Sequence, residues 1–138
     1  MTRHPAIPNA VIKALERKGD SRICLVGASS NPEKYGSIIL NNLTAKGYAV
    51  VPVNPKAGMI DGIQAYPSVQ DVPGDIAIVN FVVPPAIART ALGQMVGRDI
   101  DAVWFQDGSF DEQTVALAKR HFRHVVYDAC IMVVTNTV

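Results

Sequence analysis

The sequence predicts an α/β fold: a Rossmann-like doubly wound, mostly parallel sheet with helices on both faces. Three observations support this: short apolar runs alternate with helical patterns, the runs are rich in Val and Ile, and the connections are short. Such alternation places strands in parallel with helices crossing over between them. With 138 residues, 49% hydrophobic types and 18% charged types, we expect one domain over residues 1–138, with an N-terminal helix within 1–20 packed on it.

The first half of the chain predicts an N-terminal helix and a βαβ unit. Val11, Ile12 and Leu15 recur at helical spacing. The uninterrupted apolar run Ile23–Val26 is typical of a strand buried on both faces of a parallel sheet. The following helix ends before Gly47, because glycine commonly follows a helix C-terminus. The predicted elements are helices over about 8–18 and 38–47, strands over 23–26 and 48–53, and a short element near 63–66.

The second half repeats the strand and helix pattern. Asp75–Val83 is the strongest β segment in the chain. Pro84 and Pro85 then start a helix, because proline fits the first helical turn. The apolar tail Ile131–Val134 is expected either to pack on a partner subunit or to form a buried last strand. The predicted elements are strands over 75–83, 102–106 and 125–127 and helices over 86–96 and 111–120.

Composition excludes several classes of function. The 13 basic and 12 acidic residues leave a net charge of +1, so no overall charge favours nucleic acid or an anionic membrane. Residues 1–5 lack an apolar signal region, and no window resembles a membrane span, so we expect a cytoplasmic protein. Cys24 and Cys130 are expected to be free thiols, and no metal site is predicted. The three histidines, His4, His121 and His124, are expected at the surface.

The loop after the first strand is a candidate phosphate site. In a doubly wound sheet, ligands bind outside the carboxyl ends of the strands, where the strand order reverses. Gly27 opens a turn there, and Tyr35 begins the next helix, whose free N–H groups favour an anion. The loop matches neither the Gly-x-Gly-x-x-Gly nor the P-loop pattern. The residues alone therefore leave open a phosphate site and a plain tight turn.

The end of the second strand separates nucleotide classes. NAD-binding domains place an acidic residue about 20 residues beyond the glycines, where it accepts the ribose hydroxyls. This chain has Asn54, Pro55 and Lys56 there instead. A lysine suits a phosphorylated ribose, which favours NADP or coenzyme A over NAD. A solvated surface lysine is the alternative.

Several segments together resemble a known family. Gly47–Lys56 is the most specific of them, and the similarity extends over roughly 21–130. The chain resembles the small stand-alone CoA-binding domain proteins, a family similar to the CoA-binding domain of the succinyl-CoA synthetase α subunit. The resemblance implies a Rossmann-type fold that binds coenzyme A or an acyl-CoA without a reaction of its own. The segments in order are Leu25–Pro32, Gly47–Lys56, Ala65–Ser68, Val82–Pro85, Val103–Gln106 and Tyr127–Cys130.

The resemblance also implies which residues touch the ligand. A homo-oligomer or a partner enzyme is a separate expectation, because the apolar tail Ile131–Val134 could pack on another subunit. One loop departs from the family: relatives carry Asp-Arg-Cys followed by Pro or Lys, whereas this chain has Asp128–Met132 without a basic residue. By position, the implied contacts are Gly27, Ala28 and Ser29 with Tyr35, Gly36 and Ser37 at the phosphates, Val53, Asn54, Pro55 and Lys56 at the adenosine, Val82, Val83 and Pro84 as a wall, and Gln106 and Gly108 at the pantetheine arm.

Candidates for catalysis are few, so no catalytic residue is predicted. Ser29 lacks the nucleophile-elbow pattern of serine hydrolases. Cys130 lies on the binding side and could meet a thiol ligand, although cysteines are commonly buried and inert. Asp107 and Asp128 follow different strands and are typical of caps or solvated groups. Two alternatives to a CoA-binding module stay open: an NADP-dependent reductase, and a scaffold or regulatory protein with a vestigial nucleotide cleft.

Overall fold

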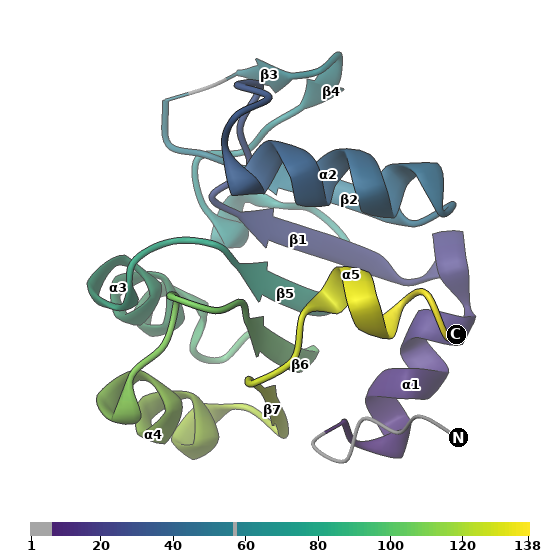
Figure 1. The fold of residues 1–138 in the computed structure, drawn as a ribbon. Coiled ribbons are helices and arrows are strands. Elements are labelled where there is room, and N and C mark those ends of the chain that lie inside the picture. The colour runs from purple at the N-terminus through teal and green to yellow at the C-terminus, as the bar shows by residue number, and fades with distance from the viewer. Residues whose placement is uncertain (1–6, 57) are drawn as a thin grey trace.

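A parallel sheet organises the chain, as Figure 1 shows. The computed structural model describes residues 7–56 and 58–138, so the expectations for His4 and for the start of the N-terminal segment lie outside the described residues. The elements are α1 (Asn9–Glu16), the 3₁₀ turn η1 (Lys18–Asp20), β1 (Arg22–Val26), α2 (Tyr35–Ala45), β2 (Ala49–Val53), β3 (Met59–Ile60), β4 (Ile63–Gln64), the 3₁₀ turn η2 (Val69–Asp71), β5 (Ile76–Phe81), α3 (Pro85–Met95), β6 (Ile100–Phe105), α4 (Glu112–His121), β7 (His124–Val126) and α5 (Ile131–Val134).

The five strands of the main sheet are all parallel and lie in the order β2-β1-β5-β6-β7. Leu25 of β1 pairs with Pro52 on one side and with Asn80 on the other. The chain leaves β1 toward β2 and leaves β5 toward β6, so the strand order reverses between β1 and β5. This is the arrangement of a doubly wound sheet, and it confirms the predicted fold class.

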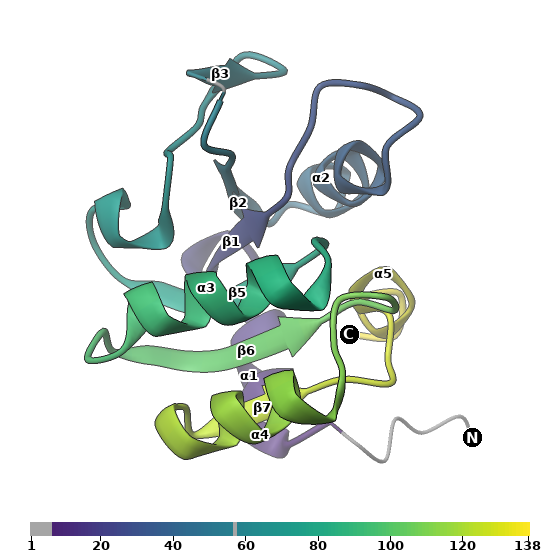
Figure 2. The ribbon, with the colours of Figure 1, turned by 90° about the vertical axis from the view of Figure 1, so that its left-hand side faces the viewer.

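Helices cover both faces of the sheet, as the two views show (Figures 1 and 2). The apolar side chains of α1, α2 and α5 pack on one face, and those of α3, α4 and η2 pack on the other. Side chains alternate along each strand. In β1, Ile23 and Leu25 point to the first face, while Cys24 and Val26 point to the second. This two-sided burial explains why β1 is a continuous apolar run.

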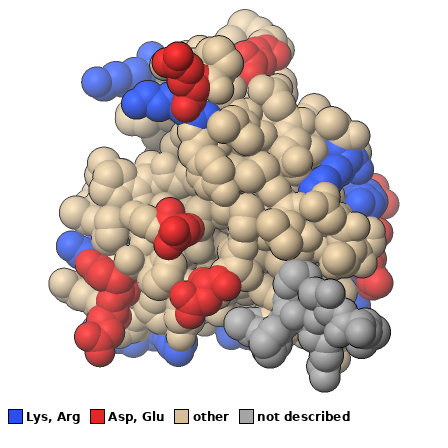
Figure 3. Space-filling view, in the orientation of Figure 1, with Lys and Arg blue, Asp and Glu red and all other residues tan. Residues whose placement is uncertain are grey.

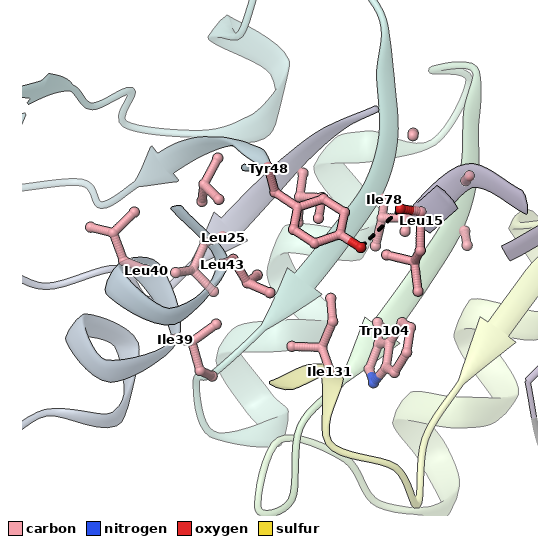
Figure 4. Close-up of a cluster of buried hydrophobic side chains, with 14 of the residues drawn as sticks. Leu15, Leu25, Ile39, Leu40, Leu43, Tyr48, Ile78, Trp104 and Ile131 are labelled. Atoms are coloured by element: carbon pink, nitrogen blue, oxygen red, sulfur yellow. Dashed lines mark hydrogen bonds between the residues drawn. The ribbon is translucent and has the colours of Figure 1, made fainter. Parts of the chain in front are cut away.

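The core on the first face is drawn in Figure 4. Leu15 of α1, Leu43 of α2, Trp104 of β6 and Ile131 of α5 are all fully buried there. The Tyr48 hydroxyl lies inside this core and donates a 2.8 Å hydrogen bond to the carbonyl oxygen of Leu15. Since a buried polar group without a partner is costly, this bond fixes α1 against the start of β2.

The tail after β7 corrects one expectation. Ile131–Val134 forms the short helix α5, with Ile131 and Val134 buried, and not a last strand. These two residues are three apart, which places both on one helical side. Asp128 has a φ of 63°, which ends the extended path of β7 before the tail begins. The tail therefore returns over the first face of its own sheet.

Other boundaries shift more modestly. The predicted strand Asp75–Val83 is shorter, because β5 ends at Phe81 and the chain turns before α3. The strand after α3 begins earlier than predicted, at Ile100. The short element expected near 63–66 is one arm of the hairpin β3–β4, whose other arm was not predicted. No helix within 7–56 or 58–138 has the length and apolar character needed to cross a bilayer.

Replacing Tyr48 with Phe should lower the free energy of unfolding by about 1–2 kcal/mol, because the carbonyl of Leu15 loses its buried donor. Urea denaturation measures this change. Tyr127→Phe is the matched control, since no hydrogen bond of its hydroxyl is found within the described residues. Equal losses for the two variants would contradict the role assigned to the buried bond.

Candidate functional site

A cleft of about 350 Å³ opens at the carboxyl ends of β1 and β2, against α3. Five residues singled out in the sequence line it together: Gly27, Val53, Asn54, Pro55 and Val83. Its walls are mainly apolar with a few polar groups, as is typical of small-molecule sites. The remaining lining residues are Val26, Pro67, Ser68, Val69, Ile87, Thr90, Ala91 and Gln94.

The turn after β1 depends on two glycines. Gly27 has a φ of +100°, and a Cβ there would lie 2.7 Å from the carbonyl oxygen of Val82. A Cβ at Gly36, in the first turn of α2, would overlap the carbonyl oxygen of Gly27. The start of α2 therefore lies directly against the turn. Lys34, the N-cap residue of α2, makes no side-chain hydrogen bond to the first N–H groups of the helix.

The side chain of Asn54 holds this turn to the end of β2. Its Nδ2 donates to the carbonyl oxygen of Ala28 at 3.0 Å, and its Oδ1 accepts from the N–H of Lys56 at 2.8 Å. The N–H of Gly27 donates to the carbonyl oxygen of Val53 at 3.1 Å. The loops after β1 and β2 are thus joined into one rim of the cleft.

The hydroxyl groups predicted at the turn have other partners. Ser29 Oγ accepts from the N–H of Asn31 at 3.0 Å, which shapes the loop. Ser37 is buried beneath the turn, and its Oγ lies 3.5 Å from Asn41 Nδ2. Backbone N–H groups are therefore better placed than Ser37 to meet an anion here.

Several residues of the predicted set lie outside the cleft. Lys56 is exposed beside Pro55 and is not among the residues that line the cleft. Pro84 is exposed where α3 begins, and Val82 contributes its carbonyl oxygen against Gly27. Gly108 is exposed in a turn with a φ of +85°. None of Pro84, Val82 and Gly108 lines the cleft itself.

A second pocket of about 340 Å³ lies at the ends of β6 and β7. It brings together Tyr35 and Gln106, which were predicted, with groups that were considered only as weak catalytic candidates or not at all. We call this pocket the Cys130 pocket. Its lining residues are Tyr35, Gln106, Asp107, Phe110, Asp128, Ala129 and Cys130.

Hydrogen-bond donors surround the Cys130 thiol. Tyr35 Oη and Gln106 Nε2 each lie 3.3 Å from its Sγ. Burial raises the pKa of Cys130, but the hydrogen bonds from Tyr35, Gln106 and the N–H groups of Met132 and Val133 outweigh it and lower the pKa below the usual thiol value. The hydrogen bond with Cys130 also raises the pKa of Tyr35 above its usual value.

A buried amide pair positions this pocket. Gln106 Oε1 accepts from Asn80 Nδ2 at 3.2 Å and from the N–H of Ile131 at 3.0 Å. These bonds leave Gln106 Nε2 directed at Cys130. Asn80 Oδ1 is buried without a hydrogen-bond partner within the described part of the chain. Asn80 could have been singled out from the sequence, since it is the one polar residue in the apolar run of β5.

The two pockets lie at the same edge of the sheet, on either side of the strand reversal. The Gly27 turn lines the cleft, and Tyr35 at the N-terminus of α2 lines the Cys130 pocket. The turn and the start of α2 therefore connect two separate hollows along one edge of the sheet. Within the described residues, no three His, Cys, Asp or Glu side chains meet in a way that could hold a metal ion.

Comparisons with known proteins show what this chain is similar to. Residues 21–136 match the model of a family described as the CoA binding domain. The uncharacterized protein YneT of Bacillus subtilis is 29% identical over 112 residues, which cover 81% of this chain and 83% of that protein. A conserved hypothetical protein of Pyrococcus furiosus has a solved structure with a TM-score of 0.78 and 39% identity, covering 82% of this chain and 97% of that one.

A third relative is an enzyme subunit that is much longer than this chain. The alpha subunit of the ADP-forming acetate–CoA ligase II of Pyrococcus furiosus is 31% identical over 91 residues. The match covers 65% of this chain and 20% of the subunit. The likeness therefore extends over only about a fifth of that enzyme subunit.

Gly36→Ala should destabilise the fold by about 2–4 kcal/mol, because the new Cβ overlaps backbone that cannot move without displacing the Gly27 turn. Gly93→Ala, in the last turn of α3, is the matched control: a Cβ there meets nothing within 4 Å, so this change should stabilise the protein by about 0.5–1 kcal/mol. Thermal and urea unfolding of both variants checks the opposite signs. A neutral Gly36→Ala would rule out the tight packing of α2 on the turn.

Iodoacetamide should modify Cys130 well before Cys24, because burial raises the pKa of Cys24 to about 12. Tyr35→Phe removes a donor to the Cys130 thiolate, so the pKa of Cys130 should rise and alkylation at neutral pH should slow severalfold. The pH dependence of the alkylation rate, followed by mass spectrometry of each cysteine, measures the shift. An unchanged pH profile in Tyr35→Phe would show that the phenol does not stabilise the thiolate.

Proposed function

Because the chain belongs to the CoA-binding domain family, we propose that it binds coenzyme A or an acyl-CoA at the carboxyl ends of its parallel sheet, without a reaction of its own. The observation that carries this proposal is the shared edge of the two pockets. The cleft at β1 and β2 has the size and walls of an adenosine site, and the Cys130 pocket lies at the ends of β6 and β7 on the same edge. A long molecule with different ends matches this layout.

The phosphates are assigned to the Gly27 turn. Gly27 and Ala28 place backbone next to the uncapped N-terminus of α2, and Gly36 lets the helix approach closely. A helix of this length carries a partial positive charge at its N-terminus, which favours a pyrophosphate. Ser29 and Tyr35 flank this position in the loop and at the helix start.

The adenosine is assigned to the cleft between Val53, Asn54, Pro55 and Val83. Coenzyme A carries a phosphate on its ribose, and the exposed ammonium of Lys56 at the rim is the group we assign to it. The backbone of Lys56 is fixed through its N–H bond to Asn54 Oδ1. The pantetheine arm then runs past Gln106 to the Cys130 pocket.

The comparisons favour neither alternative considered from the sequence, an NADP-dependent reductase or a scaffold with a vestigial cleft. The match covers only a fifth of the acetate–CoA ligase subunit, so we do not extend the ligase reaction to this chain. We propose a CoA-binding module of the cytoplasm that acts as a homo-oligomer or together with a partner enzyme.

Addition of CoA should raise the melting temperature of the protein, since a ligand bound only by the native state stabilises it. Lys56→Ala should weaken CoA binding by about five- to tenfold but leave dephospho-CoA nearly unchanged, because only CoA carries the ribose phosphate. Calorimetric titration of both ligands measures this difference, with Lys13→Ala on α1 as the matched lysine control.

Equal losses for CoA and dephospho-CoA would remove the role of Lys56 while the binding function stands. A thermal-shift series without a response to CoA or acetyl-CoA would contradict the proposed function. A response to NADP alone, together with hydride transfer to a carbonyl substrate, would support the reductase instead.

A further inference from the structure

A groove of about 380 Å³ continues from the Cys130 pocket along the start of α4. Phe110 lines both hollows, and Tyr127 of the groove directly precedes Asp128 of the Cys130 pocket. The two hollows therefore adjoin. We call the second one the Phe110 groove; it is lined by Phe110, Asp111, Glu112, Val115, Ala116, Lys119 and Tyr127.

The inner part of the Phe110 groove is apolar. The rings of Phe110 and Tyr127 lie with their centroids 5.4 Å apart and are tilted by 52°, and both side chains are only partly buried. Val115 and Ala116 of α4 complete this surface. Partly exposed aromatic rings gain free energy when an apolar group covers them. A small apolar group is the occupant that these side chains favour.

Charge around the two hollows excludes acidic occupants. Asp107 and Asp128 line the Cys130 pocket, and Asp111 and Glu112 line the Phe110 groove. Hydrogen bonds from Thr114 lower the pKa of Asp111, so this carboxylate is ionised at neutral pH, and it is paired with Arg89, whose Nη1 lies 2.9 Å from its Oδ2. Figure 3 shows acidic side chains on the part of this face nearest α4.

One basic residue opposes these carboxylates in the groove. The ammonium of Lys119 lies 5.5 Å from the centre of the Tyr127 ring. It is therefore placed over an aromatic face. With Asp111 paired to Arg89, a carboxylate at the far end of an occupant would still approach the carboxylates of Asp107, Glu112 and Asp128 and the single ammonium of Lys119.

We propose that the Phe110 groove holds the acyl group of an acyl-CoA, an inference that rests on the proposed function. The groove would select apolar acyl groups longer than acetyl over dicarboxylic ones. The distance across the sheet supports this. Four strand spacings separate β2 from β7, which is about 19 Å. A coenzyme with its adenosine at β2 directs its sulfur toward Cys130, and the group beyond the sulfur then meets Phe110.

Calorimetric titration of the intact protein with CoA, acetyl-CoA, butyryl-CoA and succinyl-CoA tests the proposal. Butyryl-CoA should bind about tenfold tighter than CoA, because each buried CH₂ contributes about 0.8 kcal/mol and the groove covers the chain only in part. Succinyl-CoA, which has the same number of acyl carbons and an added carboxylate, should bind no better than CoA.

Two substitutions test the groove itself. Tyr127→Ser should bring the ratio of butyryl-CoA to CoA affinity toward one, because it removes an apolar wall. Glu112→Lys, at an exposed site, should raise the affinity for succinyl-CoA relative to CoA. Val96→Ser is the matched control, since Val96 is also an exposed apolar residue but lies at the far end of α3.

The outcomes separate the two proposals. Absence of binding for every ligand in the series overturns the proposed function. Binding of CoA with equal affinity for butyryl-CoA and succinyl-CoA overturns the acyl groove and leaves the CoA site standing. The ligand series on the unaltered protein decides this even where Tyr127→Ser folds poorly.

Discussion

The approach of α2 to the turn after β1 is the constraint on which the binding edge depends. Gly36 allows the first turn of the helix to lie against Gly27, and Gly27 in turn lies against the carbonyl of Val82 after β5. Asn54 then joins Ala28 to the loop after β2. Three strand ends are thereby held together by backbone packing and one amide side chain. These contacts determine the shape of the cleft, since the walls of the cleft are mainly apolar side chains.

The strands and most helices could be predicted because their patterns come from burial. Ile23–Val26 is apolar throughout since both faces of β1 are covered, and the helical stripes of α1 and α2 face one core. The tail could not be assigned, because a four-residue apolar segment such as Ile131–Val134 fits a strand or a helix equally. The hairpin β3–β4 has two-residue arms, which are too short to show periodicity.

The candidate site could be predicted in part for a similar reason. In a parallel sheet, the residues that follow β1 and β2 must lie at the same edge. The sequence could therefore predict that Gly27 and Asn54 share one cleft. The contribution of Gln94 from α3 could not be predicted, because it depends on which face of the sheet each crossover helix covers. That Gln106 meets Cys130 could not be predicted either, since Gln106 is directed there by the buried Asn80 and by the N–H of Ile131.

The two ends of the chain close the same side of the molecule. Leu15 from α1 and Ile131 from α5 enter one core with Trp104, while the crossover helices α3 and α4 lie on the opposite face. During synthesis, α1 leaves the ribosome before α5, so the core that the two helices share is incomplete until α5 emerges. The nascent chain therefore carries exposed apolar surface until α5 has been made, and removal of α1 or α5 would leave that surface open to aggregation.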